Sequence, residues 1–152
     1  MKNKKFIFAG NRAYVYKEML NLDLNIIKTY VVKNSYLEKF LIENNIKYSY
    51  IFDKQTFLNE IKKLEFDYFI SNGLPIIIPV SKIKKENQSF INIHPSPLPD
   101  LRGANPITAA LLYQKNSGAT CHYMDDGIDT GDIISQIIIP YSSDLDAGLL
   151  YQ

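Results

Sequence analysis

Two polar side chains, Asn92 and His94, stand at the end of an apolar run that reads Phe-Ile-Asn-Ile-His. In a β-strand, residues two apart project to the same face, so we expect the amide and the imidazole to emerge side by side. Prolines at positions 95, 97 and 99 then end the strand and stiffen the segment that leaves it. An amide can donate to a developing oxyanion, and an imidazole that titrates near pH ~6.5 can move protons near neutrality.

An acidic loop punctuated by glycines, residues 125–132, follows later in the chain. Its Asp129 could hydrogen-bond a histidine or polarise a water molecule, and amide, imidazole and carboxylate together suit acyl-type transfer without a covalent intermediate. The sequence indicates no serine or cysteine nucleophile. Ser96 lies between two prolines, which suits a structural turn residue, whereas Cys121 and His122 are neighbours in an expected strand and should point to opposite faces.

Other interpretations of the same residues stay open on the pattern alone. His94 could be a hydrogen-bonded core histidine, and packing within a strand is the simpler interpretation of His122. The aspartates of the loop lack the twelve-residue spacing and terminal glutamate of a calcium loop. Two histidines and the Asp129 carboxylate could hold zinc, but hydrogen bonding alone can support this chemistry, and we predict no catalytic metal.

Composition and charge limit the classes of protein to which this chain can belong. The 152 residues are 46% hydrophobic and 22% charged, as expected for a globular domain with a real core. A net charge of +1 without a long basic run argues against a nucleic-acid partner. One cysteine excludes an internal disulfide, and no apolar run could span a membrane, so we expect a cytoplasmic protein. The single-glycine turn at residues 8–12 indicates a tight turn rather than a nucleotide site.

Alternating strands and helices must position the polar residues. Hydrophobic periodicity predicts strands at 5–9, 24–32, 48–52, 66–71, 89–94, 119–124 and 133–139, and helices at 12–22, 35–45, 54–64 and 105–114. Prolines break the apolar segment 74–80, which we expect to be a loop or short helix. The alternation predicts an α/β, Rossmann-like, mostly parallel twisted sheet of about seven strands with helices on both faces. His94 should lie at the carboxyl-end crevice of such a sheet.

The end of the chain carries the start of one more helix. Leu145, Leu149 and Leu150 recur at helical spacing within residues 144–152, and Ser143 or Asp144 would provide the N-cap. Such an apolar face needs something to pack against. We therefore expect residues 1–152 to form a single catalytic domain that lacks C-terminal elements.

Four stretches taken in order, 92–99, 102–106, 118–122 and 126–131, resemble the folate-dependent formyltransferase family. The resemblance implies transfer of a formyl group from the cosubstrate N10-formyltetrahydrofolate to an amine. By motif position, Asn92 would steady the oxyanion of the tetrahedral intermediate, and His94 would act as general base or acid. Asp129 would orient His94 and assist proton transfer.

The resemblance also implies a surrounding set of residues. Supporting positions around the catalytic three would be His122, Ser96 and Arg102. Segment 66–79 matches the strand and loop that line the folate pocket in that family. Folate-binding positions, mainly through backbone groups, would be Ser71, Asn72, Gly73, Leu74, Ile76, Ile78 and Asp125.

The acceptor amine is the least determined part of the expectation. Residues 102–106 resemble the methionyl-tRNA and sugar formyltransferase branches, and a tRNA enzyme should carry a further C-terminal domain and a basic face. The amino group of a nucleotide-linked amino sugar is therefore the expected acceptor, with a fragment of a methionyl-tRNA or another folate-dependent formyltransferase as the alternative. A truncated, non-catalytic folate-binding module is a further alternative, and a homodimer is possible. We expect the chain to bind a folate but to transfer formyl slowly, if at all.

Overall fold

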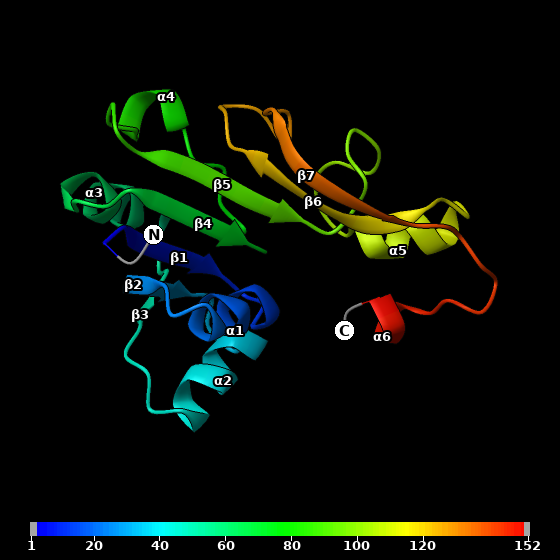
Figure 1. Cartoon of the computed structure of the whole chain (residues 1–152), viewed down its shortest axis with the longest axis horizontal. Coiled ribbons are helices and arrows are strands. Elements are labelled where there is room, and N and C mark those ends of the chain that lie inside the picture. Colours follow the sequence, from blue (N-terminus) through cyan, green and yellow to red (C-terminus); the bar gives the residue numbers. More distant parts are fainter. Residues whose placement is uncertain (1–2, 151–152) are drawn as a thin grey trace. The chain divides into compact units, whose positions relative to one another are not determined.

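The computed structural model describes residues 3–150, apart from the side chain of Leu149, and Figure 1 shows the order of its elements. Along the chain these are β1 (Lys5–Gly10), α1 (Tyr14–Asn21), β2 (Asn25–Val31), α2 (Tyr36–Glu43), β3 (Ser49–Tyr50), α3 (Lys54–Lys63), β4 (Tyr68–Asn72), α4 (Val80–Ile83), β5 (Ser89–His94), α5 (Pro106–Leu112), β6 (Ser117–Tyr123), β7 (Ile133–Ile139) and α6 (Ala147–Leu150).

The strands form a seven-stranded sheet in the order β3-β2-β1-β4-β5-β6-β7. β1 pairs in parallel with both β2 and β4, and β2 pairs in parallel with β3, whereas β6 and β7 are antiparallel. The strand order reverses direction between β1 and β4, which is the switch point of a doubly wound sheet. The predicted α/β, Rossmann-like and mostly parallel sheet is confirmed.

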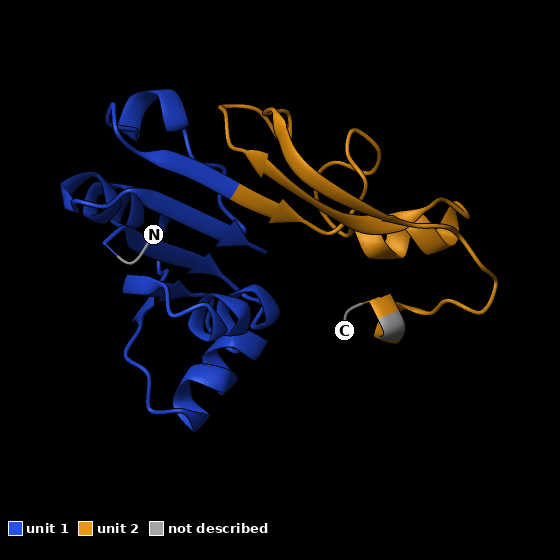
Figure 2. Ribbon diagram, in the orientation of Figure 1, with its two compact units in different colours: residues 1–91 blue, residues 92–152 orange. Residues whose placement is uncertain are grey.

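The chain divides into two compact units, Met1–Ile91 and Asn92–Gln152, which Figure 2 colours separately. The boundary falls within β5, directly before Asn92. The first unit is built around β1, whose Ile7 and Phe8 are fully buried. The second unit contains the last part of β5 and everything that follows it. The expectation of a single domain stays a prediction.

Local sequence signals explain the helices of the first unit. α2 begins after Ser35, whose hydroxyl accepts from the Glu38 N–H, and α3 begins after Asp53, whose carboxylate accepts from the Thr56 N–H at 2.9 Å. α1 begins at Tyr14, two residues later than the periodicity predicts, and its N-cap residue Ala13 makes no side-chain capping hydrogen bond.

The second unit combines the β6–β7 hairpin with α5, which starts at Pro106 as expected for proline in a first helical turn. α6 begins at Ala147, so the expected N-cap at Ser143 or Asp144 is wrong: the Leu145 N–H instead closes a turn on the Ser142 carbonyl. α6 lies against α5. Tyr151, Gln152 and the side chain of Leu149 lie outside the described residues. Among residues 3–150, no helix has the length and apolarity to cross a membrane.

Candidate active site

Three of the predicted polar side chains converge in the second unit. β5 ends at His94, which is 4% exposed, and the strand alternation places Asn92 on the same face. The Asn92 amide nitrogen donates to Asp129 Oδ1 at 3.1 Å, and His94 Nδ1 lies 3.3 Å from Asp129 Oδ2. The acidic loop therefore brings its carboxylate to the end of β5.

Asp129 is held by backbone as well as side chains. The Gly103 N–H donates to Asp129 Oδ2 at 2.9 Å, and Asp129 itself takes a left-handed backbone conformation with φ of 51°. Burial would raise the pKa of Asp129, but contacts with His122, the Gly103 N–H and the charge of His94 outweigh it, so this pKa lies below its usual value. The carboxylate is therefore charged at neutral pH.

His122, which is 2% exposed, sets the orientation of the Asn92 amide. Its Nδ1 lies 2.8 Å from the Tyr123 carbonyl oxygen, which can only accept, so Nδ1 carries the proton. Its Nε2 lies 3.2 Å from the Asn92 amide nitrogen and 3.5 Å from Asp129 Oδ1. Both N–H groups of Asn92 are thus engaged, one by His122 and one by Asp129.

His94 has an oxygen acceptor on each side of its ring. Nε2 lies 2.9 Å from the carbonyl oxygen of Leu101, a residue with φ of 58°, while Nδ1 faces the Asp129 carboxylate. A neutral ring could satisfy only one of these acceptors as a donor, and a doubly protonated ring satisfies both. An oxygen acceptor thus faces each ring nitrogen of His94, and a protonated ring would donate to both.

A buried hydroxyl holds the proline segment against β6. Thr120, fully buried, donates to the Ser96 carbonyl at 2.6 Å and accepts from the Leu98 N–H at 3.0 Å and from Gln136 Nε2 at 2.9 Å. Ser96 is also fully buried, and its hydroxyl donates to the Asp100 carbonyl at 2.8 Å. Ser96 thus orders the segment that leads to Leu101, consistent with a structural turn residue.

Sequence reasoning missed four groups of this cluster. The Leu101 carbonyl and the Gly103 N–H are backbone groups, which residue types do not reveal. Thr120 carried one usable signal, since it lies two residues before His122 and therefore shares its face of β6. Gln136 stood out as one of two polar residues in an otherwise isoleucine-rich strand.

The predicted folate-binding positions of residues 71–78 lie in the first unit. Ser71 and Asn72 are buried at the end of β4, and Gly73 has a φ of 73°. A Cβ added to Gly73 would meet Asn11 Oδ1 at 1.9 Å, and this buried oxygen has no hydrogen-bond partner among the described residues. An orphaned acceptor beside a strand end suits a ligand rich in N–H donors.

The remaining folate-binding positions divide into two groups. Leu74 and Ile76 are half-buried, whereas Ile78 is 1% exposed and belongs to the core, so only its backbone could reach a ligand. Asp125 lies in the acidic loop of the second unit, where its carboxylate accepts from the Thr130 hydroxyl at 2.7 Å and the Gly127 N–H at 3.0 Å. Asp125 therefore shapes its own loop.

Arg102 is exposed, and within residues 3–150 no hydrogen bond or ion pair joins its side chain to the Asn92–His94–Asp129 cluster.

The geometry of the cluster also bears on whether these residues could hold zinc. The described residues contain no group of three or more His, Cys, Asp or Glu side chains arranged to hold a metal ion. Both nitrogens of His94 already face oxygen acceptors. A site without catalytic metal stays our prediction.

An amide, a histidine and a carboxylate thus meet at the end of a strand in a Rossmann-like sheet. The formyl transferase family model matches residues 27–152, and the chain belongs to this family. The predicted family is thereby confirmed.

Sequence relatives include methionyl-tRNA formyltransferases. The one from Acetivibrio thermocellus is 33% identical over 118 residues, covering 76% of this chain and 38% of the relative. The one from Syntrophomonas wolfei is 38% identical over 94 residues, covering 61% of this chain and 30% of the relative. The chain thus spans about a third of the length of the relatives it matches.

Solved structures share the fold across nearly the whole chain. A phosphoribosylglycinamide formyltransferase from Streptococcus pneumoniae superposes with a TM-score of 0.80 at 20% identity, covering 99% of this chain and 89% of that one. A 4-N formyltransferase from Francisella tularensis gives 0.78 at 22% identity, covering 99% and 62%. WlaRD, a sugar 3N-formyl transferase solved with dTDP and 5-N-formyl-THF, gives 0.68 at 29% identity, covering 92% and 53%.

Proposed function

We propose that this chain carries the catalytic groups for transfer of a formyl group from N10-formyltetrahydrofolate to an amine. The observation that carries the proposal is the Asn92–His94–Asp129 cluster, in which one carboxylate binds both an amide and an imidazole. Family membership supplies the reaction class. The folate, when bound, supplies a formyl carbonyl that an amine can attack.

In this proposal His94 gives a proton to the N10 nitrogen that leaves the formyl carbon, and it regains one from the amine that attacks that carbon. Its doubly protonated ring holds one proton on Nδ1 toward Asp129 and one on Nε2 toward the Leu101 carbonyl. The Nε2 proton is the transferable one, because the Leu101 carbonyl is a neutral acceptor that substrate oxygen or nitrogen can replace. Asp129, charged at neutral pH, stabilises the imidazolium and keeps the ring in place.

Asn92 acts on the developing negative charge. Both of its N–H groups are engaged in this structure, so donation to an oxyanion requires one of them to leave His122 or Asp129. Exchange of the contact with His122 replaces a hydrogen bond to a ring nitrogen by a stronger, charge-assisted one, whereas the bond to the Asp129 carboxylate is already charge-assisted. Asn92 thereby favours the charged state of the reaction over the ground state.

For the folate, we propose the loop after β4 as the binding segment. The unpartnered Asn11 oxygen beside Gly73 and the backbone of residues 71–74 fit the amide-like edge of a pterin ring, which offers N–H donors. Asp125 and the backbone of residues 76–78 remain assigned to folate binding as part of this proposal.

As acceptor we propose the amino group of a nucleotide-linked amino sugar. One observation supports it, the likeness to the sugar 3N-formyl transferase WlaRD at 29% identity; the motif at residues 102–106 is compatible with it but is shared with the methionyl-tRNA branch. The relatives named methionyl-tRNA formyltransferases favour a second candidate, an aminoacyl-tRNA acceptor.

Two measurements on the full chain test the proposal. Calorimetric titration with 5-formyltetrahydrofolate tests the folate site, and absence of binding would refute it. A radiolabelled formyl-transfer assay then compares a panel of nucleotide-linked amino sugars with methionyl-tRNA. Transfer to tRNA alone would overturn the sugar assignment, and folate binding without transfer to any amine would favour the non-catalytic binding module.

A further inference from the structure

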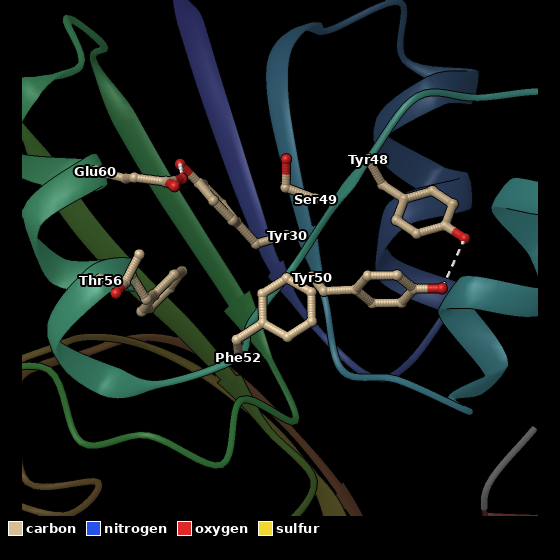
Figure 3. A pocket seen from close by; sticks show the side chains of 8 residues that line it. Tyr30, Tyr48, Ser49, Tyr50, Phe52, Thr56 and Glu60 are labelled. Atoms are coloured by element: carbon tan, nitrogen blue, oxygen red, sulfur yellow. Dashed lines mark hydrogen bonds between the residues drawn. The ribbon is translucent and has the colours of Figure 1, made fainter.

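A cavity of about 290 Å³ opens in the first unit between β2, β3 and α3, and Figure 3 shows the side chains around it. Its volume is at the lower end of the range for small-molecule sites. None of its residues belongs to the folate-binding or catalytic positions proposed above. Aromatic rings dominate the lining, which consists of Tyr30, Tyr48, Tyr50, Phe52 and Phe57 together with Ser49, Thr56 and Glu60.

Some of the aromatic rings are buried at the base of the cavity, and others are exposed at its edge. Tyr30 and Phe57 are 1% and 3% exposed and meet edge to face with ring centroids 5.1 Å apart. Phe52 is 82% exposed, and its ring lies 5.6 Å from that of Tyr50. A phenylalanine this exposed beside a cavity leaves a ring face available to a ligand.

A fixed carboxylate stands beside these rings. The Tyr30 hydroxyl donates to Glu60 Oε2 at 3.0 Å, and Figure 3 shows the two side chains meeting over one side of the cavity. The bond orients the Glu60 carboxylate toward the Tyr30 hydroxyl. The cavity thus combines the negative faces of aromatic rings with one negative side chain, a combination that attracts cations.

A cation of the chain itself already uses one of the rings. The ammonium of Lys28 lies 5.2 Å from the centroid of the Tyr30 ring. Lys28 and Tyr30 are two residues apart on β2 and therefore project to the same face. The Tyr30 ring thus already lies beside a positively charged nitrogen.

We propose that this aromatic cavity, formed by the eight residues above, binds a small organic ammonium ion. Aromatic rings recognise alkylated ammonium groups through the ring faces, and Glu60 adds charge neutralisation. A neutral ligand of the same shape would gain the apolar contacts alone. Charge is therefore the property that distinguishes this ligand class from other small molecules.

A matched pair of probes tests the proposal on the full chain. Choline carries the charge, and 3,3-dimethylbutan-1-ol has nearly the same shape without it. Titration followed by the aromatic proton resonances should give a dissociation constant on the order of 1 mM for choline, because the ligand is small. The neutral alcohol should bind at least ~5-fold more weakly. No choline binding, or equal binding of the two probes, would overturn the proposal.

Variants then separate charge and ring contributions. Glu60→Gln can still accept from Tyr30 and should weaken choline at least ~5-fold, whereas Glu86→Gln, at an exposed carboxylate outside the lining, should not. Phe52→Leu should weaken choline by about twofold to fivefold, with the 84%-exposed Tyr36→Leu as control.

The Lys28→Gln substitution should change choline affinity in the opposite direction. Removing the chain's own ammonium takes a repulsive charge away from the neighbourhood of the Tyr30 ring, so choline should bind more tightly than to the wild type. Weaker or unchanged binding in this variant would contradict recognition by charge, as would a Glu60→Gln variant with wild-type affinity.

Discussion

Replacing Thr120 by valine should destabilise the chain far more than its small change in shape suggests. Valine keeps the branched outline and the β-propensity of threonine, so the substitution removes the hydroxyl and little else. That hydroxyl is the hydrogen-bond partner of two backbone groups in the proline segment, the Ser96 carbonyl and the Leu98 N–H.

The expected loss follows from those two groups. A buried polar group left without its partner costs about 1–3 kcal/mol, so the two together cost about 2–6 kcal/mol. Gln136 adds little, because its Nε2 also donates to the Leu98 carbonyl at 2.8 Å and keeps that bond. A domain is typically stable by only about 5–15 kcal/mol, so the variant should be strongly destabilised.

The loss of stability is measured by urea unfolding. Far-ultraviolet circular dichroism and tyrosine fluorescence monitor the transition, since the chain has eleven tyrosines and no tryptophan. Thr120→Ser keeps the hydroxyl and should lose about 1 kcal/mol. Thr108→Val, at an exposed position of α5, should change stability by less than ~0.5 kcal/mol. A loss below ~1 kcal/mol in Thr120→Val, or an equal loss in Thr120→Ser, would refute the hydrogen-bond argument.

Three further outcomes are expected. His94→Asn should lower formyl transfer at least ~100-fold with the circular dichroism spectrum unchanged, and near-normal turnover would remove His94 from the mechanism. The pKa of Asp129 is lowered by folding, so its charge stabilises the chain above the unfolded-state value of about 3.9, and this contribution disappears as the pH falls through the folded-state value. The stability gap between wild type and Asp129→Asn in urea titrations should therefore narrow below pH ~4, and a constant gap would contradict this. Gly118→Ala should cost more than ~2 kcal/mol in thermal or urea unfolding, because the new Cβ would lie 2.1 Å from the Ile137 carbonyl oxygen, whereas exposed Gly148→Ala should not.

The fold could be predicted largely because its signals are local. β5 matches the predicted strand because an apolar run is stopped by prolines directly after His94. The starts of α2 and α3 were set by Ser35 and Asp53, which are side-chain caps visible in the sequence. Leu20 of α1 is apolar yet 40% exposed, because the orientation of a short helix depends on its packing partners rather than on its own pattern.

The site was predictable only in its side chains. Residue types and strand alternation placed Asn92 and His94 together, but the atoms that complete the cluster belong to the backbone. The Leu101 carbonyl reaches His94 because Leu101 takes a left-handed conformation, which is rare for a bulky residue and has no sequence signal. Tertiary contacts select such conformations, and a single sequence does not show them.

Asp129 joins stretches of sequence that are otherwise far apart, and this has a genetic consequence. Asn92, the Gly103 N–H and both histidines meet at its two oxygen atoms. Substitutions at these positions share one partner, so their effects will not add. A change that displaces the carboxylate removes most of what a second change could still remove. A second replacement around the cluster should therefore cost much less in a background that has already lost the carboxylate than in the intact chain.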